Sequence, residues 1–173
     1  MANLILGQDG IDVEVHYESL NDNDIEIIGC QPKMDPSGIW TAGYGHAIVV
    51  NGQFLRGKEN EAIAYRYTIS SDSEARDLLA KDNAKFEAQI NSLNLNLQQF
   101  QFDALVSFIY NVGFGNLLSS TLLKFIKTDM PSERITTAYL MWNKSGGVIL
   151  PGLTFRRQTE ALLFTTGELK FFN

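Results

Sequence analysis

The chain has 173 residues, the length of about one domain, and 45% of them are hydrophobic, 11% aromatic and 20% charged. Fourteen Lys and Arg against 20 Asp and Glu give a net charge of −6, and no basic run is longer than Arg156-Arg157, which argues against a nucleic-acid-binding protein. The single cysteine, Cys30, excludes a disulfide framework. The sequence contains no run of about 18 apolar residues, so no membrane span is predicted.

The first predicted element is a helix over residues 9–20. Ile11, Val15 and Glu18 fall at helical spacing on one face, which places a glutamate in line with two branched apolar side chains. From residue 21 to about 70 the sequence changes to short β-forming runs separated by turns. The Asn51-Gly52 pair between such runs predicts a hairpin, so we expect a small β-lobe here.

From residue 71 onward the pattern is helical. Ser71 and Glu74 have the spacing of a capping box, which predicts the start of a long helix. Residues 98–112 are apolar on nearly every side, as expected of a buried central helix.

Three further helices are predicted at about 120–128, 131–143 and 153–166. Asp129 or Ser132 is the expected N-cap of the second, and Gly167 is the expected stop of the third. The sequence therefore predicts an α+β fold in one domain, 1–173, with a small β-lobe, a larger helical lobe and a catalytic cleft between them.

Two carboxylates stand in contrasting surroundings. Glu18 lies among apolar residues, which would raise its pKa, whereas Asp35 lies in a polar Asp-Pro-Ser-Gly turn, where it would stay ionised. Cleavage of a glycosidic bond needs such a pair, one carboxyl protonated and one charged. A glutamate near a helix end is more often a solvated or capping residue, so residue types alone are a weak signal.

Local sequence motifs give a stronger signal for this function than the two residue types do. The segments GIDVEVHYE (10–18) and DPSGIWTAGYGH (35–46) resemble the start of the phage-type lysozymes, the endolysins of glycoside hydrolase family 24. FDALVSFIYNVG (102–113) with SSTLL (119–123), and LPGLTFRRQTEALL (150–163), resemble later parts of the same family. These blocks cover nearly the whole chain in the family's order, which makes them more specific together than singly.

The resemblance implies a lysozyme-like fold and a catalytic Glu, Asp and Thr. Asp35 and Thr41, with five residues between them, match the family's spacing between the catalytic Asp and Thr. Glu18 matches the family's helical segment, but sixteen residues separate it from Asp35, about twice the usual gap. Glu26 has the usual eight residues between it and Asp35 but no helical segment before it. A loop absorbs extra residues at small entropic cost, so we choose Glu18 and keep Glu26 as the alternative.

The implied reaction is hydrolysis of the β-1,4 bond between N-acetylmuramic acid and N-acetylglucosamine in peptidoglycan. Glu18 would be the general acid, and Asp35 and Thr41 would hold the attacking water or stabilise the oxocarbenium-like transition state. The resemblance favours inversion, which places the two carboxyls roughly 6.5–9.5 Å apart. No metal or organic cofactor is needed.

Four more residues are candidates for binding substrate by the same resemblance: Tyr110, Asn111, Ser120 and His46. Three of them have a structural alternative: core packing for Tyr110, helix capping for Ser120, and pairing with a carboxylate of the helical lobe for His46. With His16 as the one other histidine, a metal site at His46 is not expected.

Several other residues are expected to be structural. Trp142 and Arg156 are expected to pack and form ion pairs. Cys30 need not be catalytic, because Asp35 fills the position where some family members have cysteine.

Competing functions remain. A lytic transglycosylase would need the acid without Asp35 and Thr41. A non-catalytic wall-binding phage component would need neither carboxylate, and an antibacterial effector would use the same chemistry as a phage lysozyme.

The protein is expected to be a monomer without signal peptide or signal anchor. It is expected to stay in the host cytoplasm until a holin-type lesion gives it access to the periplasmic wall. Neither nucleic acid nor stable membrane insertion is expected.

Overall fold

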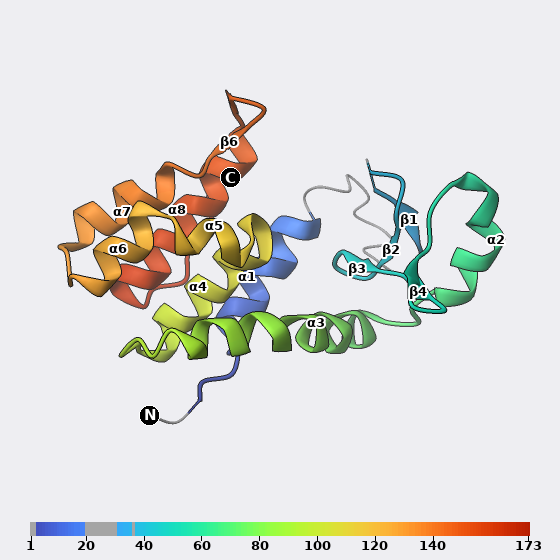
Figure 1. The fold of residues 1–173 in the computed structure, drawn as a ribbon, viewed down its shortest axis with the longest axis horizontal. Coiled ribbons are helices and arrows are strands. Elements are labelled where there is room, and N and C mark those ends of the chain that lie inside the picture. Colours follow the sequence, from blue (N-terminus) through green and yellow to red (C-terminus); the bar gives the residue numbers. More distant parts are fainter. Residues whose placement is uncertain (1–2, 20–30, 36) are drawn as a thin grey trace. The chain divides into compact units, whose positions relative to one another are not determined.

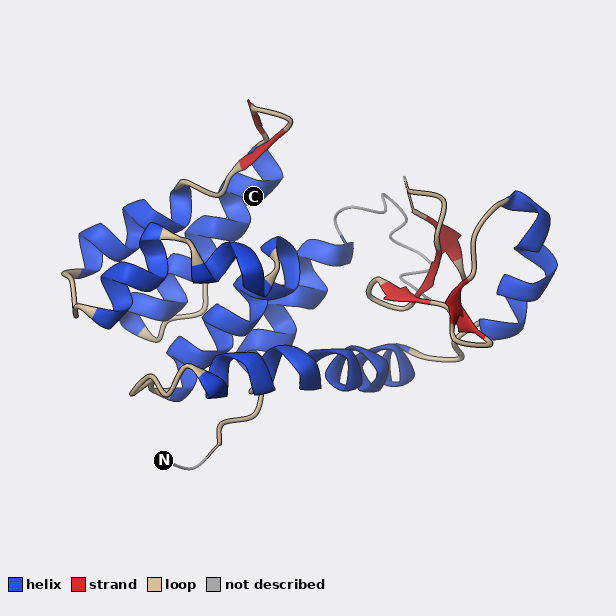
Figure 2. Cartoon of the chain, in the orientation of Figure 1, coloured by secondary structure: helices blue, strands red, loops and turns tan. Residues whose placement is uncertain are grey.

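The architecture is taken from a computed structural model that describes residues 3–19, 31–35 and 37–173 (Figures 1 and 2). It is an α+β arrangement, as predicted. The helices are α1 (Gln8–Ser19), α2 (Glu61–Ala64), α3 (Asp72–Ser92), α4 (Gln99–Val112), α5 (Phe114–Leu118), α6 (Thr121–Lys127), α7 (Ser132–Leu140) and α8 (Pro151–Thr166). The strands are β1 (Lys33–Met34), β2 (Trp40–Ala42), β3 (His46–Ala47), β4 (Val49–Val50), β5 (Gln53–Phe54), β6 (Lys144–Ser145) and β7 (Val148–Ile149), and short 3₁₀ turns cover Lys58–Asn60 and Tyr65–Tyr67.

The chain divides into two units. The sheet unit is Glu14–Asp82, and the helical unit combines Met1–Val13 with Asn83–Asn173. The boundary between them falls inside α1 and inside α3. None of the helices within the described ranges is long and apolar enough to cross a membrane.

Short antiparallel strands form the sheet unit. They are paired in the order β1-β2-β3, with β4 and β5 as a separate hairpin. Asn51 and Gly52 have φ values of 51° and 78°, which is the left-handed pair that a tight two-residue hairpin turn requires. The hairpin predicted from Asn-Gly is confirmed.

Helix α3 begins close to the predicted residue, with a different capping partner. The Glu74 N–H donates to Ser71 Oγ at 3.2 Å, as the capping box predicts. The Glu74 carboxylate instead accepts from the backbone N–H and hydroxyl of Ser70, at 2.8 and 2.6 Å. The return half of the box is therefore made by the preceding serine.

Helix α4 is the centre of the helical unit. Every residue from Phe102 to Ile109 is buried, and the helix packs against α8, which in turn packs against α7 (Figure 1). Burial on all sides explains why this segment is apolar nearly all round. The predicted central helix is confirmed.

The helix ends that follow α4 differ in part from the sequence prediction. Neither Asp129 nor Ser132 caps α7, because Pro131 is the N-cap and Ser132 is already the first helical residue. Gly167 ends α8 with a left-handed φ of 74°, as predicted.

Helix α2, which lies within the predicted β-lobe, was missed, and so were two later elements. Helix α5 is a short turn directly after Gly113, and the β6–β7 hairpin turns at Gly146-Gly147, whose φ values are 57° and 83°. Strands of two residues are too short for an alternating pattern, so the Gly-Gly pair was the one available signal.

Candidate active site

Asp35 and Thr41 lie on one face of the small sheet. Lys33 pairs with Thr41 in the β1–β2 ladder. The Asp35 N–H donates to the Ile39 carbonyl at 2.8 Å, which extends the ladder by one residue pair beyond Met34 and Trp40. Side chains alternate between faces along a strand, so Asp35 shares a face with Lys33 and therefore with Thr41. Such diagonal neighbours are roughly 7–8 Å apart at Cα. The hairpin brings together two of the three predicted catalytic residues.

The Asp35 carboxylate is held by its own turn. Oδ1 accepts from the backbone N–H groups of Ser37 and Ile39, both at 2.8 Å, and the Ser37 hydroxyl donates to the same carboxylate. Partial desolvation raises the pKa of Asp35, but these hydrogen bonds and the charge of Arg56 outweigh it, so the net pKa is lowered. Asp35 is therefore ionised at neutral pH, as predicted from its polar turn.

Arg56 is a neighbour of Asp35 that the sequence analysis missed. It follows β5 and forms an isolated antiparallel bridge with Ile39, so the β-lobe folds it back onto the Asp35 turn. Its Nη1 lies 3.4 Å from the Ser37 carbonyl oxygen. No spacing rule connects it to Asp35, because the contact depends on how the sheet folds.

Thr41 stands in the middle of β2 and is half-buried. Its hydroxyl donates to the Lys33 carbonyl oxygen at 3.1 Å, across the ladder. The Thr41 oxygen keeps its lone pairs for a further donor such as water.

Glu18 is the next-to-last residue of α1 and is half-buried, within the sheet unit. Glu14, one helical turn earlier, is completely buried, and the sequence analysis did not single it out. The i, i+4 spacing places both carboxylates on one side of α1. The alternative acid Glu26, and Cys30 with it, lie outside the described residues.

His46 pairs with a carboxylate, as its structural alternative predicts. It lies opposite Ala42 on β3, so its side chain leaves the sheet on the face opposite to that of Thr41. Its Nδ1 is 2.8 Å from Asp82 Oδ2, in α3. This pairing orients the ring toward the helix.

The other predicted substrate-binding residues belong to the helical unit. Tyr110 and Asn111 are in the last turn of α4, where Tyr110 meets Phe86 edge-on with ring centroids 5.7 Å apart and Asn111 is exposed. Ser120 caps α6, because its hydroxyl accepts from the Leu123 N–H at 3.0 Å and donates to the Leu117 carbonyl at 2.7 Å. Its capping role is confirmed.

A buried ion cluster joins α4 and α8. Glu160 is fully buried and bridges Arg156 and Arg157, with its oxygens 3.1 and 2.8 Å from their Nε atoms. The Ser107 hydroxyl donates to Glu160 Oε1 at 2.9 Å. Trp142 packs edge-on against Phe108. The ion-pair and packing roles predicted for Arg156 and Trp142 are confirmed.

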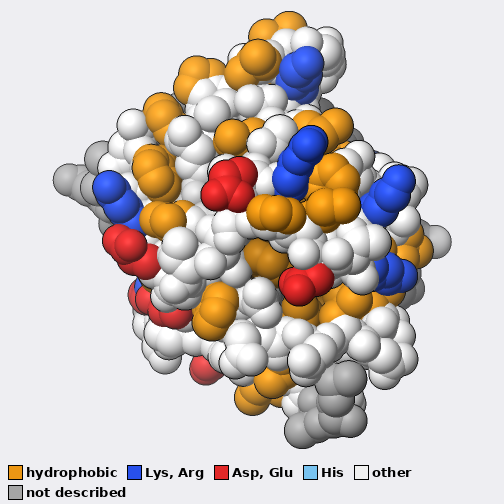
Figure 3. Space-filling model, turned by 90° about the vertical axis from the view of Figure 1, so that its left-hand side faces the viewer, with side chains coloured by type: hydrophobic (Ala, Val, Ile, Leu, Met, Phe, Trp, Pro, Cys, Tyr) orange, Lys and Arg blue, Asp and Glu red, His pale blue; other side chains and the backbone are white. Residues whose placement is uncertain are grey.

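The negative charge of the chain is concentrated in the sheet unit. That unit contains twelve Asp and Glu and six Lys and Arg, whereas the helical unit contains eight of each. Figure 3 shows acidic and basic side chains interspersed on the face where α6 and α7 lie. The excess of carboxylates therefore accompanies Glu18 and Asp35.

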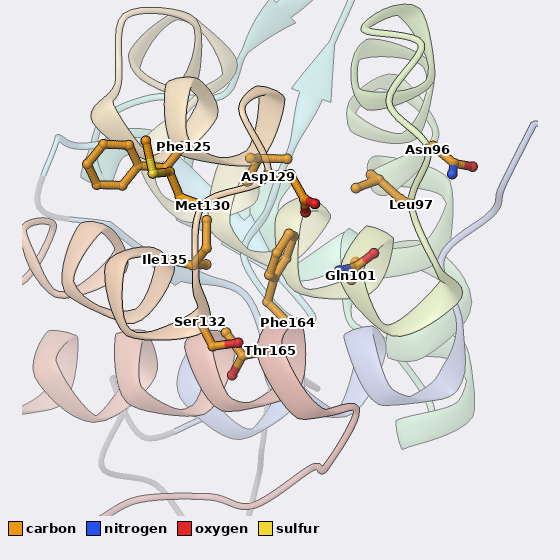
Figure 4. A pocket seen from close by; sticks show the side chains of 11 residues that line it. Asn96, Leu97, Gln101, Phe125, Asp129, Met130, Ser132, Ile135, Phe164 and Thr165 are labelled. Atoms are coloured by element: carbon orange, nitrogen blue, oxygen red, sulfur yellow. The ribbon is translucent and has the colours of Figure 1, made fainter.

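The helical unit holds a small pocket of about 170 Å³ between the start of α4, the α6–α7 turn and the end of α8. Figure 4 shows Phe125 and Met130 on one side and Asn96 and Leu97 on the other. It contains none of the predicted site residues. Among the residues that the structure describes, no three His, Cys, Asp or Glu side chains cluster closely enough to hold a metal ion.

Comparison with known proteins gives consistent results. The family model described as phage lysozyme matches residues 24–160. The endolysin of Bacillus phage B103 is 34% identical over 95% of this chain and 56% of its own length, and the endolysin of Salmonella phage P22 is 33% identical over 75% of this chain and 82% of its own. An endolysin structure from Escherichia coli O157:H7 phage FAHEc1 superimposes with a TM-score of 0.74 at 26% identity, covering 98% of both chains. This chain spans about half the length of the Bacillus phage endolysins that it matches.

The family match includes Glu26, Asp35 and Thr41 but begins after Glu18. The match with the Bacillus phage B103 endolysin extends over 95% of the chain. The choice between Glu18 and Glu26 therefore rests on the helical segment before Glu18 and on experiment.

Proposed function

Because this chain belongs to the phage lysozyme family, we propose that it is a muramidase that hydrolyses the β-1,4 bond between N-acetylmuramic acid and N-acetylglucosamine in peptidoglycan. The observation that carries the proposal is the Asp35 carboxylate, kept ionised by its turn on the same sheet face as Thr41. An ionised carboxylate beside a hydroxyl is suited to holding and activating one water molecule.

Glu18 is the proposed general acid. It would protonate the leaving glycosidic oxygen while the water held by Asp35 and Thr41 attacks the opposite face of the sugar, which inverts the anomeric centre. This chemistry requires no metal or organic cofactor. We propose that the whole chain acts as one catalytic domain and as a monomer.

Most of the candidate substrate contacts outside the carboxylates lie in the helical unit. We propose that the exposed amide of Asn111 and the phenol of Tyr110 bind the glycan, with Ser120 and His46 as further candidates. An amide offers paired donor and acceptor groups, and an aromatic ring offers a flat apolar face to a pyranose.

The biological setting in this proposal is lysis of a bacterial host at the end of a phage cycle. The protein would stay in the host cytoplasm until a holin-type partner opens a path to the periplasmic wall. Expression of the chain inside Gram-negative cells tests this dependence, since lysis is expected only after chloroform permeabilises the cytoplasmic membrane or a holin is co-expressed.

The chemistry is tested by analysing the sugar ends released from purified peptidoglycan. Reducing ends are expected from the wild type, with activity lost in Glu18→Gln and Asp35→Asn and retained in Glu26→Gln, all checked for folding by circular dichroism. Anhydro ends would instead identify a lytic transglycosylase. No release by folded wild type would leave a wall-binding protein, and loss in Glu26→Gln alone would transfer the acid role to Glu26.

A further inference from the structure

Hydrogen bonds of the backbone around Arg56 hold this residue next to the Asp35 turn. It pairs with Ile39 in an antiparallel bridge, and the next N–H, of Gly57, donates to the Gly38 carbonyl at 3.0 Å. The Asn60 side chain donates to the Arg56 carbonyl at 2.7 Å. These three contacts fix the point from which the arginine side chain extends beside Asp35.

Within the described part of the chain, the guanidinium of Arg56 makes one hydrogen bond. The side chain is exposed, and of its five N–H groups one donates to a protein acceptor in the described ranges, the Ser37 carbonyl at 3.4 Å. No carboxylate oxygen of those ranges lies within 4.0 Å of it. A planar cation with free donors is suited to binding a carboxylate through two parallel hydrogen bonds.

Asp35 does not need Arg56 as a hydrogen-bond partner. Its carboxylate already accepts from the backbone of Ser37 and Ile39 and from the Ser37 hydroxyl. The arginine acts on it through charge alone, so its donors remain available to a ligand at the same site.

Arg56 is a cation in a unit with an excess of negative charge. The sheet unit carries twelve acidic and six basic side chains, which repel an anionic substrate. Peptidoglycan is anionic because its peptide stems carry carboxylates, and the muramyl lactyl group carries one wherever its stem has been removed. A substrate of that kind needs a local cation where it approaches Asp35.

We propose that Arg56 is a specificity-determining residue that binds a carboxylate of the muramyl lactyl group or peptide stem next to Asp35, and so distinguishes peptidoglycan from uncharged glycans. This inference rests on the proposed muramidase function. Arg56 binds substrate and takes no part in proton transfer.

The test compares Arg56→Gln with Arg66→Gln, which removes one exposed arginine from the same unit outside the Asp35 turn. Three soluble substrates are used at pH 7: glycan strands with peptide stems, strands stripped of stems by an amidase, and stem-bearing strands whose carboxyls are amidated with methylamine. Folding is checked by circular dichroism.

For Arg56→Gln we expect KM on strands with carboxylates to rise about tenfold with kcat within about twofold, the effect of losing a charge-assisted hydrogen bond. Arg66→Gln should match the wild type, and Arg56→Lys should recover part of the loss. On the amidated strands the wild type should show the higher KM, and Arg56→Gln should add nothing.

A loss on stripped strands assigns the lactyl carboxylate, and a loss confined to stem-bearing strands assigns the peptide carboxylate. An equal loss on charged and amidated strands, or a wild type that does not distinguish them, overturns the proposal. Failure of the muramidase function itself gives a separate result, namely no cleavage of any strand by the wild type.

Discussion

The Ser37 hydroxyl lies 2.8 Å from Asp35 Oδ1 and 2.9 Å from Oδ2, so one short side chain reaches both oxygens of the candidate catalytic carboxylate. The Ser37 backbone N–H donates to the same group. Ser37 thereby fixes the orientation of the carboxylate and stabilises its charged form.

Ser37→Ala is expected to move the acid limb of the activity profile to higher pH. Removing the hydroxyl takes one hydrogen bond from the charged carboxylate, so the pKa of Asp35 rises. Because the proposed reaction needs ionised Asp35, activity is then lost at a higher pH as the pH falls. The shift is expected to be small because the turn is near solvent.

The shift is measured as the acid limb of kcat/KM and, independently, by NMR titration of the Asp35 carboxyl. Ser73→Ala, an exposed serine in the first turn of α3, is the control. An unmoved acid limb in Ser37→Ala, with an unmoved Asp35 titration, would contradict the assigned role.

Thr41→Val is expected to lower kcat about 10²-fold while the fold is kept, because misplacing a reacting group by about an ångström has an effect of that size. The backbone ladder holds β2 in register, and the Thr41 hydroxyl contributes one exposed hydrogen bond to the Lys33 carbonyl. Thr68→Val is a matched control, since it also removes a hydroxyl that donates to a carbonyl in the same unit. Wild-type kcat in Thr41→Val would exclude Thr41 from the water site.

Sequence patterns predicted the elements that depend on local rules. The Asn51-Gly52 hairpin, the apolar helix α4 and the Gly167 helix stop each follow from backbone preference or burial. The polar turn at Asp35 also predicted its ionised state.

Contacts that depend on tertiary folding were not predictable in the same way. Arg56 reaches Asp35 through a bridge to Ile39, and no rule of spacing leads from one to the other. The burial of Glu14 was missed because a charged residue on a helix is ordinarily solvated. The expected caps of α7 failed because Pro131 sets the helix start through its own fixed φ of −55°.

Asp103→Asn is expected to gain stability relative to the wild type as the pH rises. Burial raises the pKa of Asp103, and nearby Asp9 and Glu87 add to that, while hydrogen bonds from Gly7 and Gln99 oppose it; the net pKa is raised. The folded state therefore binds the proton more tightly than the unfolded chain, so the wild type loses stability as the pH rises from about 4 through the folded pKa.

Asparagine keeps the contacts and removes the titration. Gly7 N–H and Gln99 Nε2 both donate to Oδ1 at 2.8 Å, an oxygen that asparagine retains. Free energies of unfolding from urea titrations at pH 3.5 and pH 7 check the prediction, with the exposed Asp129→Asn as control. A difference between Asp103→Asn and wild type that does not change with pH would refute it.

Glu160→Gln is expected to destabilise the protein by about 3–5 kcal/mol, the range for removing one partner of a buried ion pair. Glu160 is the carboxylate that both Arg156 and Arg157 contact, and all three side chains are almost completely buried. Burial lowers the pKa of Arg157 to about 10, against the attraction of Glu160, so the cation already bears a desolvation cost that this carboxylate offsets. The free energy of unfolding at pH 7 measures the loss, with the exposed Glu168→Gln expected within about 0.5 kcal/mol of wild type.

A double variant separates the effect of uncompensated charge from that of lost packing. If the cost comes from uncompensated charge, Arg157→Met should recover part of the stability when combined with Glu160→Gln, although it is destabilising alone. A double variant whose losses simply add would show instead that the two side chains act through packing.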